Sequence, residues 1–202
     1  MEIWIATNNA GKIKEYELLF KEIPNLKLHT QQEISGFTAR PEDGKTFEEN
    51  ARIKVKSLAA IKNRVWVIGE DSGLEVAGMN GLPGIHSARY AGPKAADSEN
   101  VTKLLKMMGL KGVTDRKAKF TASLVVATPQ GETWAFTGTM EGEIAKAPKG
   151  QMGFGYDSVF IPTGQTQTLA ELGPGYKTQH SHRSDAAKQF LRKLSEASNV
   201  QL

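Results

Sequence analysis

The sequence contains no cysteine among its 202 residues. Disulfide bonds, catalysis by a thiolate and metal sites built on cysteine are therefore excluded. No run approaches the ~20 consecutive apolar residues that a membrane-spanning helix needs. The opening segment, MEIWIATNNAGK, also lacks the basic and apolar regions of a signal peptide. We therefore expect a cytoplasmic protein that does not enter a membrane.

Neither sign of charge dominates the composition. The formal net charge is +4, hydrophobic residues make up 39% and charged residues 24%, a balance typical of globular domains. The mild positive charge favours anionic partners, but it does not distinguish a nucleotide from a nucleic acid. We expect residues 1–202 to form a single domain, and this length allows it to have two lobes.

Helical and strand-like patterns are mixed along the chain. Apolar residues at spacings of three and four predict helices over 12–23, after the cap at Thr46, over 101–109 and over 184–197. Apolar runs predict strands over 2–6, 65–68, 120–128, 132–139 and 158–161. The third and fourth strands would form a hairpin, and residues 29–45 and 78–93 would form loops. This mixture predicts a mixed sheet in an α/β or α+β fold.

The first candidate site is the polar turn Thr7–Lys12, between a predicted strand and a predicted helix. Backbone N–H groups and the positive end of a helix dipole suit a phosphate there, and the Lys12 ammonium adds a charge. A helix cap with a surface lysine also explains the pattern. On these residues alone, that plainer interpretation is the better one.

A second stretch imitates a phosphate-binding P-loop. Residues 44–46 read Gly-Lys-Thr, but the earlier glycine that the motif requires is replaced by Ala39. Acidic residues also stand where phosphates would lie, so we reject a P-loop. We interpret Glu42 as a candidate metal ligand. Lys54, about two helical turns beyond Thr46, either reaches the same site or is solvated.

The strongest purely physical signal is the segment Glu70-Asp71-Ser72-Gly73, which follows a predicted buried strand. Ligands of α/β sheets bind at the carboxyl ends of strands, and adjacent carboxylates are costly unless a cation or a proton neutralises them. Oxygen-rich sites that also face phosphates suit Mg²⁺. An exposed acidic turn is the alternative, and we favour the metal site.

Two further stretches have residues that could bind a base. Residues 150–157 combine glycines, which allow close approach to the backbone, with the aromatic faces of Phe154 and Tyr156 and the acceptor Asp157. A glycine-rich bend with its aromatic rings in the core is the alternative.

Lys177 and the triplet 181–183 precede the last helix and could bind a carbonyl oxygen or a phosphate. A capped helix start explains that triplet equally well.

Six motifs together resemble the inosine triphosphate pyrophosphatase family, which removes non-standard purine nucleotides. The motifs extend from Thr7 to Arg183, and their order and spacing are specific. They read Thr7-x-Asn9-x-x-Lys12, Gly44-x-Thr46-Phe47-x-Glu49-Asn50-Ala51, Asp71-Ser72-Gly73-Leu74, Pro83-Gly84-x-x-Ser87-Ala88-Arg89, Gly153-Phe154-Gly155-Tyr156-Asp157 and Ser181-His182-Arg183.

The resemblance implies an elongated, two-lobed α/β fold on a twisted mixed β-sheet with flanking helices and an active-site cleft between the lobes. It implies a homodimer that uses Mg²⁺ to hydrolyse ITP, dITP and XTP to the monophosphate and pyrophosphate. Neither nucleic acid nor a membrane is an expected partner.

The resemblance also assigns roles to single residues. Asp71 would be the general base for the attacking water, and Mg²⁺ would be held by Glu42 and by Glu70 or Asp71. The triphosphate would be bound by Thr7, Asn9, Lys12 and Lys54, with Asn8, Ser72 and Arg89 also in the substrate-binding set. The purine would stack on Phe154 and be framed by Gly155, Tyr156, Asp157, Lys177, His182 and Arg183, which would favour a 6-keto group.

Three positions depart from the commonest family pattern. Glu70 stands where many bacterial members have aspartate, and His86 stands where tyrosine is frequent. Residues 172–176 read Leu-Gly-Pro-Gly-Tyr, where members usually have a charged helical stretch before the lysine. The longer side chain of Glu70 bears on the position of the metal, and His86 bears on the packing of its loop. The residues 172–176 bear on the geometry of Lys177.

Three other functions are weighed against this one. A septum-formation type pyrophosphatase usually opens with a serine and paired arginines, whereas this chain opens with Thr7-Asn8-Asn9 and Lys12. A nucleic-acid-binding protein would need a basic stripe, but here the lysines alternate with glutamates. A regulatory nucleotide sensor is disfavoured because both carboxylates and both lysines are present.

Overall fold

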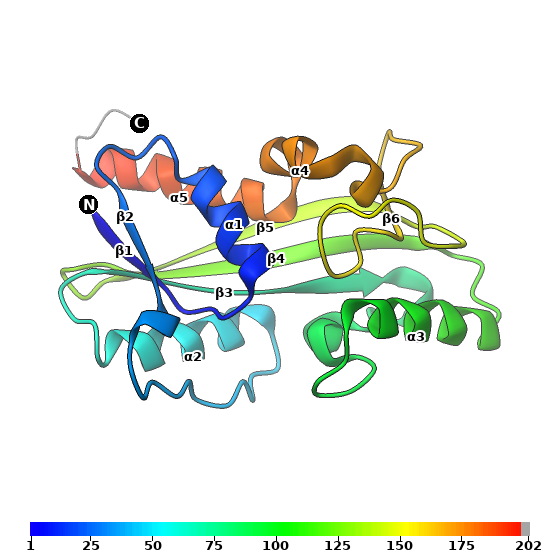
Figure 1. The fold of residues 1–202 in the computed structure, drawn as a ribbon, viewed down its shortest axis with the longest axis horizontal. Helices are drawn as coiled ribbons and strands as arrows, with labels where there is room; N and C mark the ends of the chain where they lie inside the picture. The colour runs from blue at the N-terminus through cyan, green and yellow to red at the C-terminus, as the bar shows by residue number, and fades with distance from the viewer. Residues whose placement is uncertain (199–202) are drawn as a thin grey trace. The chain divides into compact units, whose positions relative to one another are not determined.

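In the computed structural model, which describes residues 1–198, six strands form a sheet with the order β2-β1-β3-β4-β5-β6 (Figure 1). The strands are β1 (Glu2–Ile5), β2 (Lys27–Thr30), β3 (Trp66–Val76), β4 (Lys117–Ala127), β5 (Thr133–Ile144) and β6 (Phe160–Pro162). The α-helices are α1 (Ala10–Leu19), α2 (Phe47–Ala59), α3 (Asp97–Leu110), α4 (Leu169–His180) and α5 (His182–Ser198). Short 3-10 helices are η1 (Gln31–Glu33), η2 (Ala77–Met79) and η3 (Gly84–Arg89).

The sheet is mixed, as the sequence predicts. β1 pairs in parallel with both β2 and β3, whereas β5 and β6 are antiparallel. The chain divides into two compact units: unit 1 comprises Met1–Asp71, Ala122–Gly138 and Arg183–Leu202, and unit 2 comprises Ser72–Thr121 and Thr139–His182. Strands β3, β4 and β5 each contribute residues to both units.

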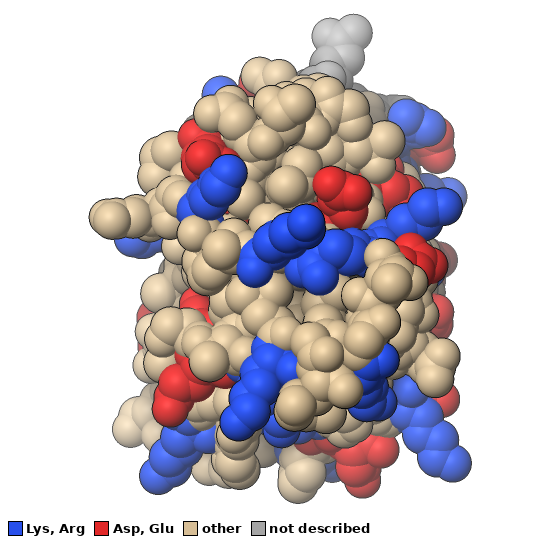
Figure 2. All heavy atoms as spheres, turned by 90° about the vertical axis from the view of Figure 1, so that its right-hand side faces the viewer, with Lys and Arg blue, Asp and Glu red and all other residues tan. Residues whose placement is uncertain are grey.

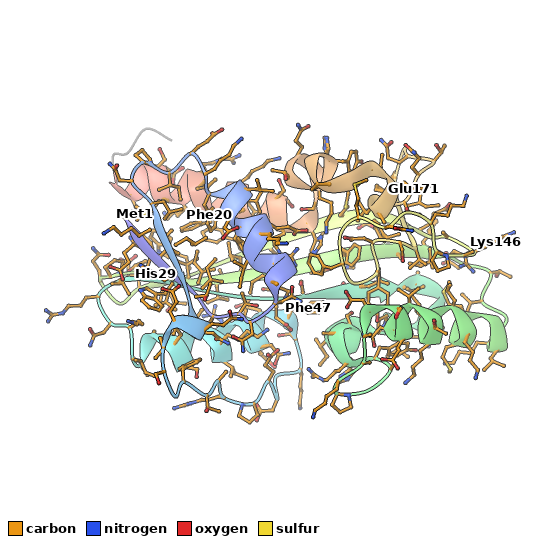
Figure 3. The ribbon with its side chains drawn as sticks, in the orientation of Figure 1. Met1, Phe20, His29, Phe47, Lys146 and Glu171 are labelled. Atoms are coloured by element: carbon orange, nitrogen blue, oxygen red, sulfur yellow. The ribbon has the colours of Figure 1, made fainter. Side chains whose placement is uncertain are left out.

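In unit 1, helices cover both faces of the sheet because side chains alternate along β1. Ile3 and Ile5 belong to the apolar cluster formed with α1 and α5, whereas Trp4 belongs to the cluster formed with α2. Phe20, at the end of α1, lies in the first of these layers (Figure 3), with its ring centroid 5.6 Å from that of Phe190. Figure 1 shows α1 and α5 on one side of the strands and α2 on the other.

Unit 2 has one apolar core. It is formed by residues of β3, β4, β5, α3, β6 and the start of α4, among them Leu74, Leu104, Phe160 and Leu169. The side chain of Tyr156 is also buried in this cluster. The glycine-rich segment 150–157 is therefore attached to a packed core.

Several predicted elements are confirmed. Strand β1, the hairpin of β4 and β5, and helix α5 lie where the apolar patterns predict them. The hairpin is closed by a hydrogen bond from Thr128 N–H to the Glu132 carbonyl (2.9 Å). Thr46 caps α2, because its side chain accepts a hydrogen bond from Glu49 N–H at 3.1 Å.

Two predictions of local structure are wrong, and one helix was not predicted. Residues 29 and 30, predicted to begin a loop, belong to an edge strand, β2, and residues 169–180, for which no element was predicted, form α4, which is broken at Gly173 (φ 80°, ψ −177°). Residues 70–73 lie within β3 and not in a turn after it. Glycine and acidic residues are poor strand formers, but Gly69 is required here by packing. A Cβ on Gly69 would lie 2.6 Å from the Ala51 carbonyl oxygen of α2.

Within the described residues, no helix is long and apolar enough to cross a membrane.

Candidate active site

The turn after β1 has hydrogen bonds that prepare the start of α1 for an anion. Asn9 is the N-cap, and its Oδ1 accepts from Lys12 N–H at 3.0 Å, while Asn9 N–H donates to Thr7 Oγ1 at 3.1 Å. The side chain of Asn8 is held by Gln31, whose Nε2 donates to Asn8 Oδ1 at 2.9 Å. The first turn of α1 contains no acidic residue, so the positive end of the helix dipole is available to a phosphate.

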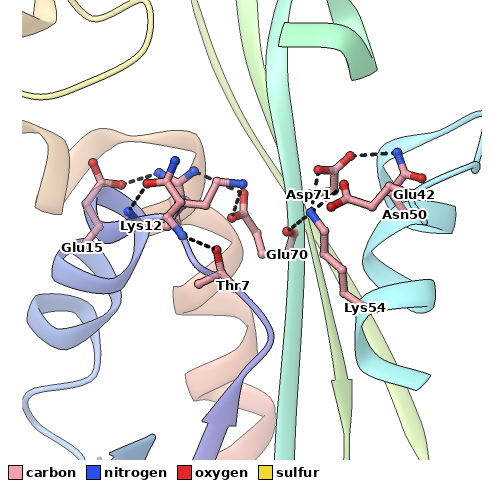
Figure 4. Close-up of polar contacts among 10 residues, drawn as sticks. Thr7, Lys12, Glu15, Glu42, Asn50, Lys54, Glu70 and Asp71 are labelled. Atoms are coloured by element: carbon pink, nitrogen blue, oxygen red, sulfur yellow. Dashed lines mark hydrogen bonds and ion pairs between the residues drawn. The ribbon is translucent and has the colours of Figure 1, made fainter. Parts of the chain in front are cut away.

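Lys12 projects from this turn into a buried ionic cluster. Its Nζ lies 3.0 Å from Glu70 Oε2 (Figure 4). Arg183 Nη2 lies 3.2 Å from Glu70 Oε1. Arg183 also pairs with Glu15 of α1. Glu70 and Arg183 are both only 1% exposed, so their charges are stabilised by one another and not by water.

Burial and charge shift the pKa values in this cluster in different directions. Burial lowers the pKa of Lys12 below its ordinary value, although Glu70 opposes the shift. Burial would also lower the pKa of Arg183, but Glu70 and Glu15 outweigh it and raise that pKa. Burial, together with Glu70, raises the pKa of Tyr16 well above its ordinary value. Lys12 therefore holds its proton less firmly than an ordinary lysine.

A second ionic cluster is centred on Asp71. Lys54 of α2 lies between two carboxylates, with its Nζ 3.0 Å from Asp71 Oδ1 and 2.9 Å from Glu42 Oε2. Asn50 Nδ2 donates to the other oxygen of Asp71 at 3.1 Å. Burial alone would lower the pKa of Lys54, but Asp71 and Glu42 raise it above its ordinary value. Both oxygens of Asp71 are therefore held by donors from α2.

The two clusters lie on opposite faces of β3. Successive side chains of a strand point to opposite sides of its sheet, and Figure 4 shows Glu70 directed toward Lys12 and Asp71 directed toward Lys54. The sequence predicts Glu42, Glu70 and Asp71 as metal ligands. Among these, Glu42 and Asp71 approach the same ammonium group, whereas Glu70 is engaged on the other face.

Glu42 and Asp71 fit a divalent cation by their chemistry. A single cationic group already sits within 3.0 Å of both carboxylates, which shows that their oxygens converge. No group of three or more histidine, aspartate or glutamate side chains is gathered for metal binding in residues 1–198. Mg²⁺ is usually bound by one or two carboxylates together with substrate phosphates, so a pair is a sufficient protein contribution.

A third cluster lies in unit 2 around the glycine-rich segment. Lys177 Nζ is 2.7 Å from Asp157 Oδ2 and 4.5 Å from the centroid of the Phe154 ring. Asp157 Oδ2 also accepts from Phe154 N–H at 2.9 Å. A Cβ at Gly153 would lie 2.1 Å from the same carboxylate oxygen, so only glycine fits there. Lys177, which follows the break of α4 at Gly173, therefore contacts both Asp157 and Phe154.

The remaining predicted residues are placed as follows. Tyr156 is buried in the core of unit 2, where its hydroxyl donates to the Ser87 carbonyl at 2.8 Å. The ring of His182 stacks on Phe120 with centroids 4.8 Å apart. Ser72 is half-buried in β3, and Arg89 is half-buried at the end of η3. Arg183, predicted at the purine edge, contacts Glu15 and Glu70 of unit 1.

Sequence reasoning gave no role to two residues that complete the clusters, Asn50 and Glu15. Asn50 precedes Lys54 by four positions on α2, a spacing that places both side chains on one helix face. Glu15 follows Lys12 by three positions on α1 in the same way. Both spacings can be read from the sequence. The contact between Glu15 and Arg183 cannot be predicted in this way, because the two residues are 168 positions apart.

The model of the Ham1 family matches residues 3–193. The chain belongs to the Ham1 family. This Ham1 chain is 64% identical over 194 residues to the dITP/XTP pyrophosphatase of Bdellovibrio bacteriovorus, a match covering 96% of this chain and 98% of that protein. It is 43% identical over 201 residues to the dITP/XTP pyrophosphatase of Bacillus subtilis, covering 97% and 98%.

The fold agrees with solved Ham1 structures. The Ham1 protein of Staphylococcus aureus matches with a TM-score of 0.86 and 40% identity, over 98% of this chain and 100% of that one. The HAM1 protein from Coxiella burnetii matches with a TM-score of 0.86 and 36% identity, over 97% and 99%. The resemblance drawn from the six motifs and the α/β fold with a mixed sheet are thereby confirmed.

Proposed function

We propose that this Ham1-family protein hydrolyses non-standard purine nucleoside triphosphates, such as dITP, XTP and ITP, to the monophosphate and pyrophosphate, and so removes them from the nucleotide pool. The observation that carries the proposal is the Asp71 cluster. The Asp71 carboxylate accepts from the Asn50 amide and the Lys54 ammonium group, and the Glu42 carboxylate approaches the same ammonium group. The names of the relatives support the substrate class.

The triphosphate would be received in unit 1. The turn Thr7–Lys12 offers backbone N–H groups and a helix start, and Lys12 and Lys54 offer charges now shared with Glu70 and Asp71. Phosphates would compete with these carboxylates for the two ammonium groups. Phosphoryl transfer depends mainly on such positioning and charge stabilisation.

Asp71 would act as the general base. Asn50 and Lys54 hold its two oxygens, so the carboxylate is oriented before a substrate arrives. It would take a proton from the water that attacks the α-phosphorus, and pyrophosphate would leave. Glu42 and Asp71 would hold Mg²⁺, which supplies charge neutralisation for the phosphates.

The purine would be recognised in unit 2. The Phe154 ring would stack on the base, and the Lys177 ammonium, which lies over that ring and contacts Asp157, would donate to a 6-keto oxygen. Adenine presents an amino group at that position and would leave two donors facing each other. A site built on such a hydrogen bond discriminates by about 10⁴-fold or more. The roles predicted for His182 and Arg183 at the base edge stay predictions.

The test is a substrate panel. Pyrophosphate release would be measured from dITP, XTP, ITP, GTP, ATP and CTP, with Mg²⁺ and with EDTA. We expect fast, metal-dependent release from dITP, XTP and ITP, and a kcat/KM for ATP lower by about 10⁴-fold. Equal rates for ATP and ITP would contradict the account of the purine site, and release from no substrate would contradict the proposed function itself.

Three further features belong to this proposal: a single pyrophosphatase domain of two lobes, a homodimer and a cytoplasmic location. The shared strands β3, β4 and β5 support the first, and the family resemblance supports the second and the third. Light scattering on the purified protein tests the dimer.

Nucleic acid is not a proposed partner. On the face drawn in Figure 2, acidic side chains lie beside the basic ones.

A further inference from the structure

Both peptide groups that flank Phe154 are held by side chains of unit 2. Its own N–H donates to Asp157 Oδ2 at 2.9 Å. The next peptide is held on both sides: the Phe154 carbonyl accepts from Asp157 N–H at 3.2 Å, and Gly155 N–H donates to Asp97 Oδ2 at 2.7 Å. Because a peptide is planar and turns only about φ and ψ, these bonds set the direction in which the Phe154 side chain leaves the backbone.

Asp97 is the one member of this set that does not belong to the segment 150–157. It is the first residue of α3, 58 positions earlier in the chain, where the helix dipole favours a carboxylate. The distance of 2.7 Å lies in the range of charge-assisted hydrogen bonds. Asp97 is also absent from the six motifs that resemble the family.

Packing gives little support to the side of the segment that Asp97 holds. A cavity of about 270 Å³ is lined there by Asp97, Phe154, Gly155 and neighbouring residues. Gly155 has φ +61°, and a Cβ on it would meet no atom within 4 Å. On this side, the peptide is restrained by the hydrogen bond that Gly155 N–H donates to Asp97. The far side is held differently, because Asp157 is buried and bound to Lys177.

We propose that Asp97 is a positioning residue for purine binding, which acts through the Gly155 amide to hold the Phe154 ring in place for stacking. The inference rests on the proposed function, in which Phe154 stacks on the base. The stack forms in the ground state and persists in the transition state, so its disturbance raises KM and leaves kcat unchanged.

The experiment compares Asp97→Ala, Asp97→Asn and the wild type with dITP. Asp97→Ala should raise KM about fivefold to tenfold, a fraction of what a base–aromatic stack contributes, with kcat within about twofold. Asp97→Asn should restore KM, because its amide oxygen accepts the same hydrogen bond. The inhibition constant of inorganic tripolyphosphate, which has no base, should be the same in all three proteins.

Asp115→Ala is the matched control. Asp115 is another exposed aspartate of unit 2 whose Oδ1 accepts from a backbone N–H, that of Lys117 at 3.1 Å. Its substitution should leave KM unchanged. An unchanged KM in Asp97→Ala, an equal rise in Asp97→Asn, or an equal weakening of tripolyphosphate would each overturn the proposal.

Hydrogen exchange separates this proposal from the proposed function. Asp97→Ala should speed exchange of the amides in 150–158 and leave the buried part of α3 unchanged. If the wild type hydrolyses none of the nucleotides, the proposed function fails, and faster exchange still supports the hold of Asp97 on the segment. Unchanged exchange overturns that hold whatever the activity.

Discussion

Glu70 and Asp71 are adjacent in β3, yet each carboxylate contacts a different lysine: Glu70 pairs with Lys12 of α1 and Asp71 with Lys54 of α2. The alternation of side chains along a strand produces this separation. Because of this separation, the two acidic residues have different roles. Asp71 faces Glu42 and the donors of α2, whereas Glu70 neutralises a half-buried lysine and a buried arginine. Their substitutions should therefore have different consequences.

Asp71→Asn should abolish catalysis without unfolding the protein. A positioned general base contributes about 10²–10⁴-fold to rate, and the loss of a metal ligand adds to that, so kcat for dITP should fall by at least this factor. The amide keeps one oxygen to accept from Lys54 or Asn50, and Glu42 still pairs with Lys54, so the variant should stay folded and lose less stability than Glu70→Gln. Pyrophosphate release and thermal unfolding measure the two effects.

Asp43→Asn is the control for this substitution, because Asp43 is an exposed aspartate in the loop that contains Glu42. It removes the same charge and should keep full activity. An Asp71→Asn enzyme within about tenfold of the wild type, less than a lost base should cost, would rule out the role assigned to Asp71.

Glu70→Gln should instead destabilise the fold. Glu70 is buried and contacts both Lys12 and Arg183, so its loss leaves buried positive charge without its carboxylate. Breaking such a pair costs about 3–5 kcal/mol. Urea denaturation measures the change in the free energy of unfolding. Glu48→Gln, which breaks an exposed pair with Arg52, should cost less than about 1 kcal/mol, and equal losses in the two variants would contradict this account of Glu70.

The sequence was sufficient to predict the parts of this site that depend on local chemistry. The strand, turn and helix around Thr7–Lys12 and the cap at Thr46 follow from neighbouring residues, and both are present in the structure. The continuation of β3 through residues 70–73 could not be predicted in this way. It depends on the approach of α2 to Gly69 and on ionic partners from two helices.

The position of Arg183 shows the same limit. Its role at the purine edge stays a prediction, and the contacts of its guanidinium with Glu15 and Glu70 could not be foreseen. No local pattern links residues that are 168 positions apart. Likewise α4 was not predicted, because Gly173 and Pro174 are helix breakers. In the structure, two helical runs of α4 meet at Gly173.

Gly69→Ala should destabilise unit 1, because its Cβ would lie 2.6 Å from the Ala51 carbonyl oxygen and 2.7 Å from Val55 Cγ2. Overpacking against backbone costs about 1–3 kcal/mol, measurable by urea denaturation. Gly109→Ala is the matched control. Gly109 lies in the last turn of α3 with no atom within 4 Å of a built Cβ, so alanine there should stabilise by about 0.5–1 kcal/mol. The same sign of change in both variants would contradict the close contact between α2 and β3.

A pH-dependent contribution to stability should arise at Glu33. Its carboxylate accepts from Thr30 N–H and lies 2.7 Å from His29 Nδ1, and the hydrogen bonds to His29 and Thr30 lower the pKa of Glu33 below its ordinary value of 4.5. Because the folded-state pKa is the lower one, ionised Glu33 stabilises the fold fully above pH 4.5, and this contribution is lost as the pH falls through the lowered value. The side chain is exposed, so the effect should be small.

Melting temperatures of the wild type and Glu33→Gln, measured from pH 7 to acid, test this sign. The wild type should be the more stable protein at neutral pH, and the difference should shrink toward zero only below the ordinary pKa of glutamate. Glu17→Gln removes the same charge from an exposed position on α1 and should show no such convergence. A difference that grows on acidification would mean that protonated Glu33 is the better partner for His29, which would reverse the assignment of the hydrogen bond as the cause of the lowered pKa.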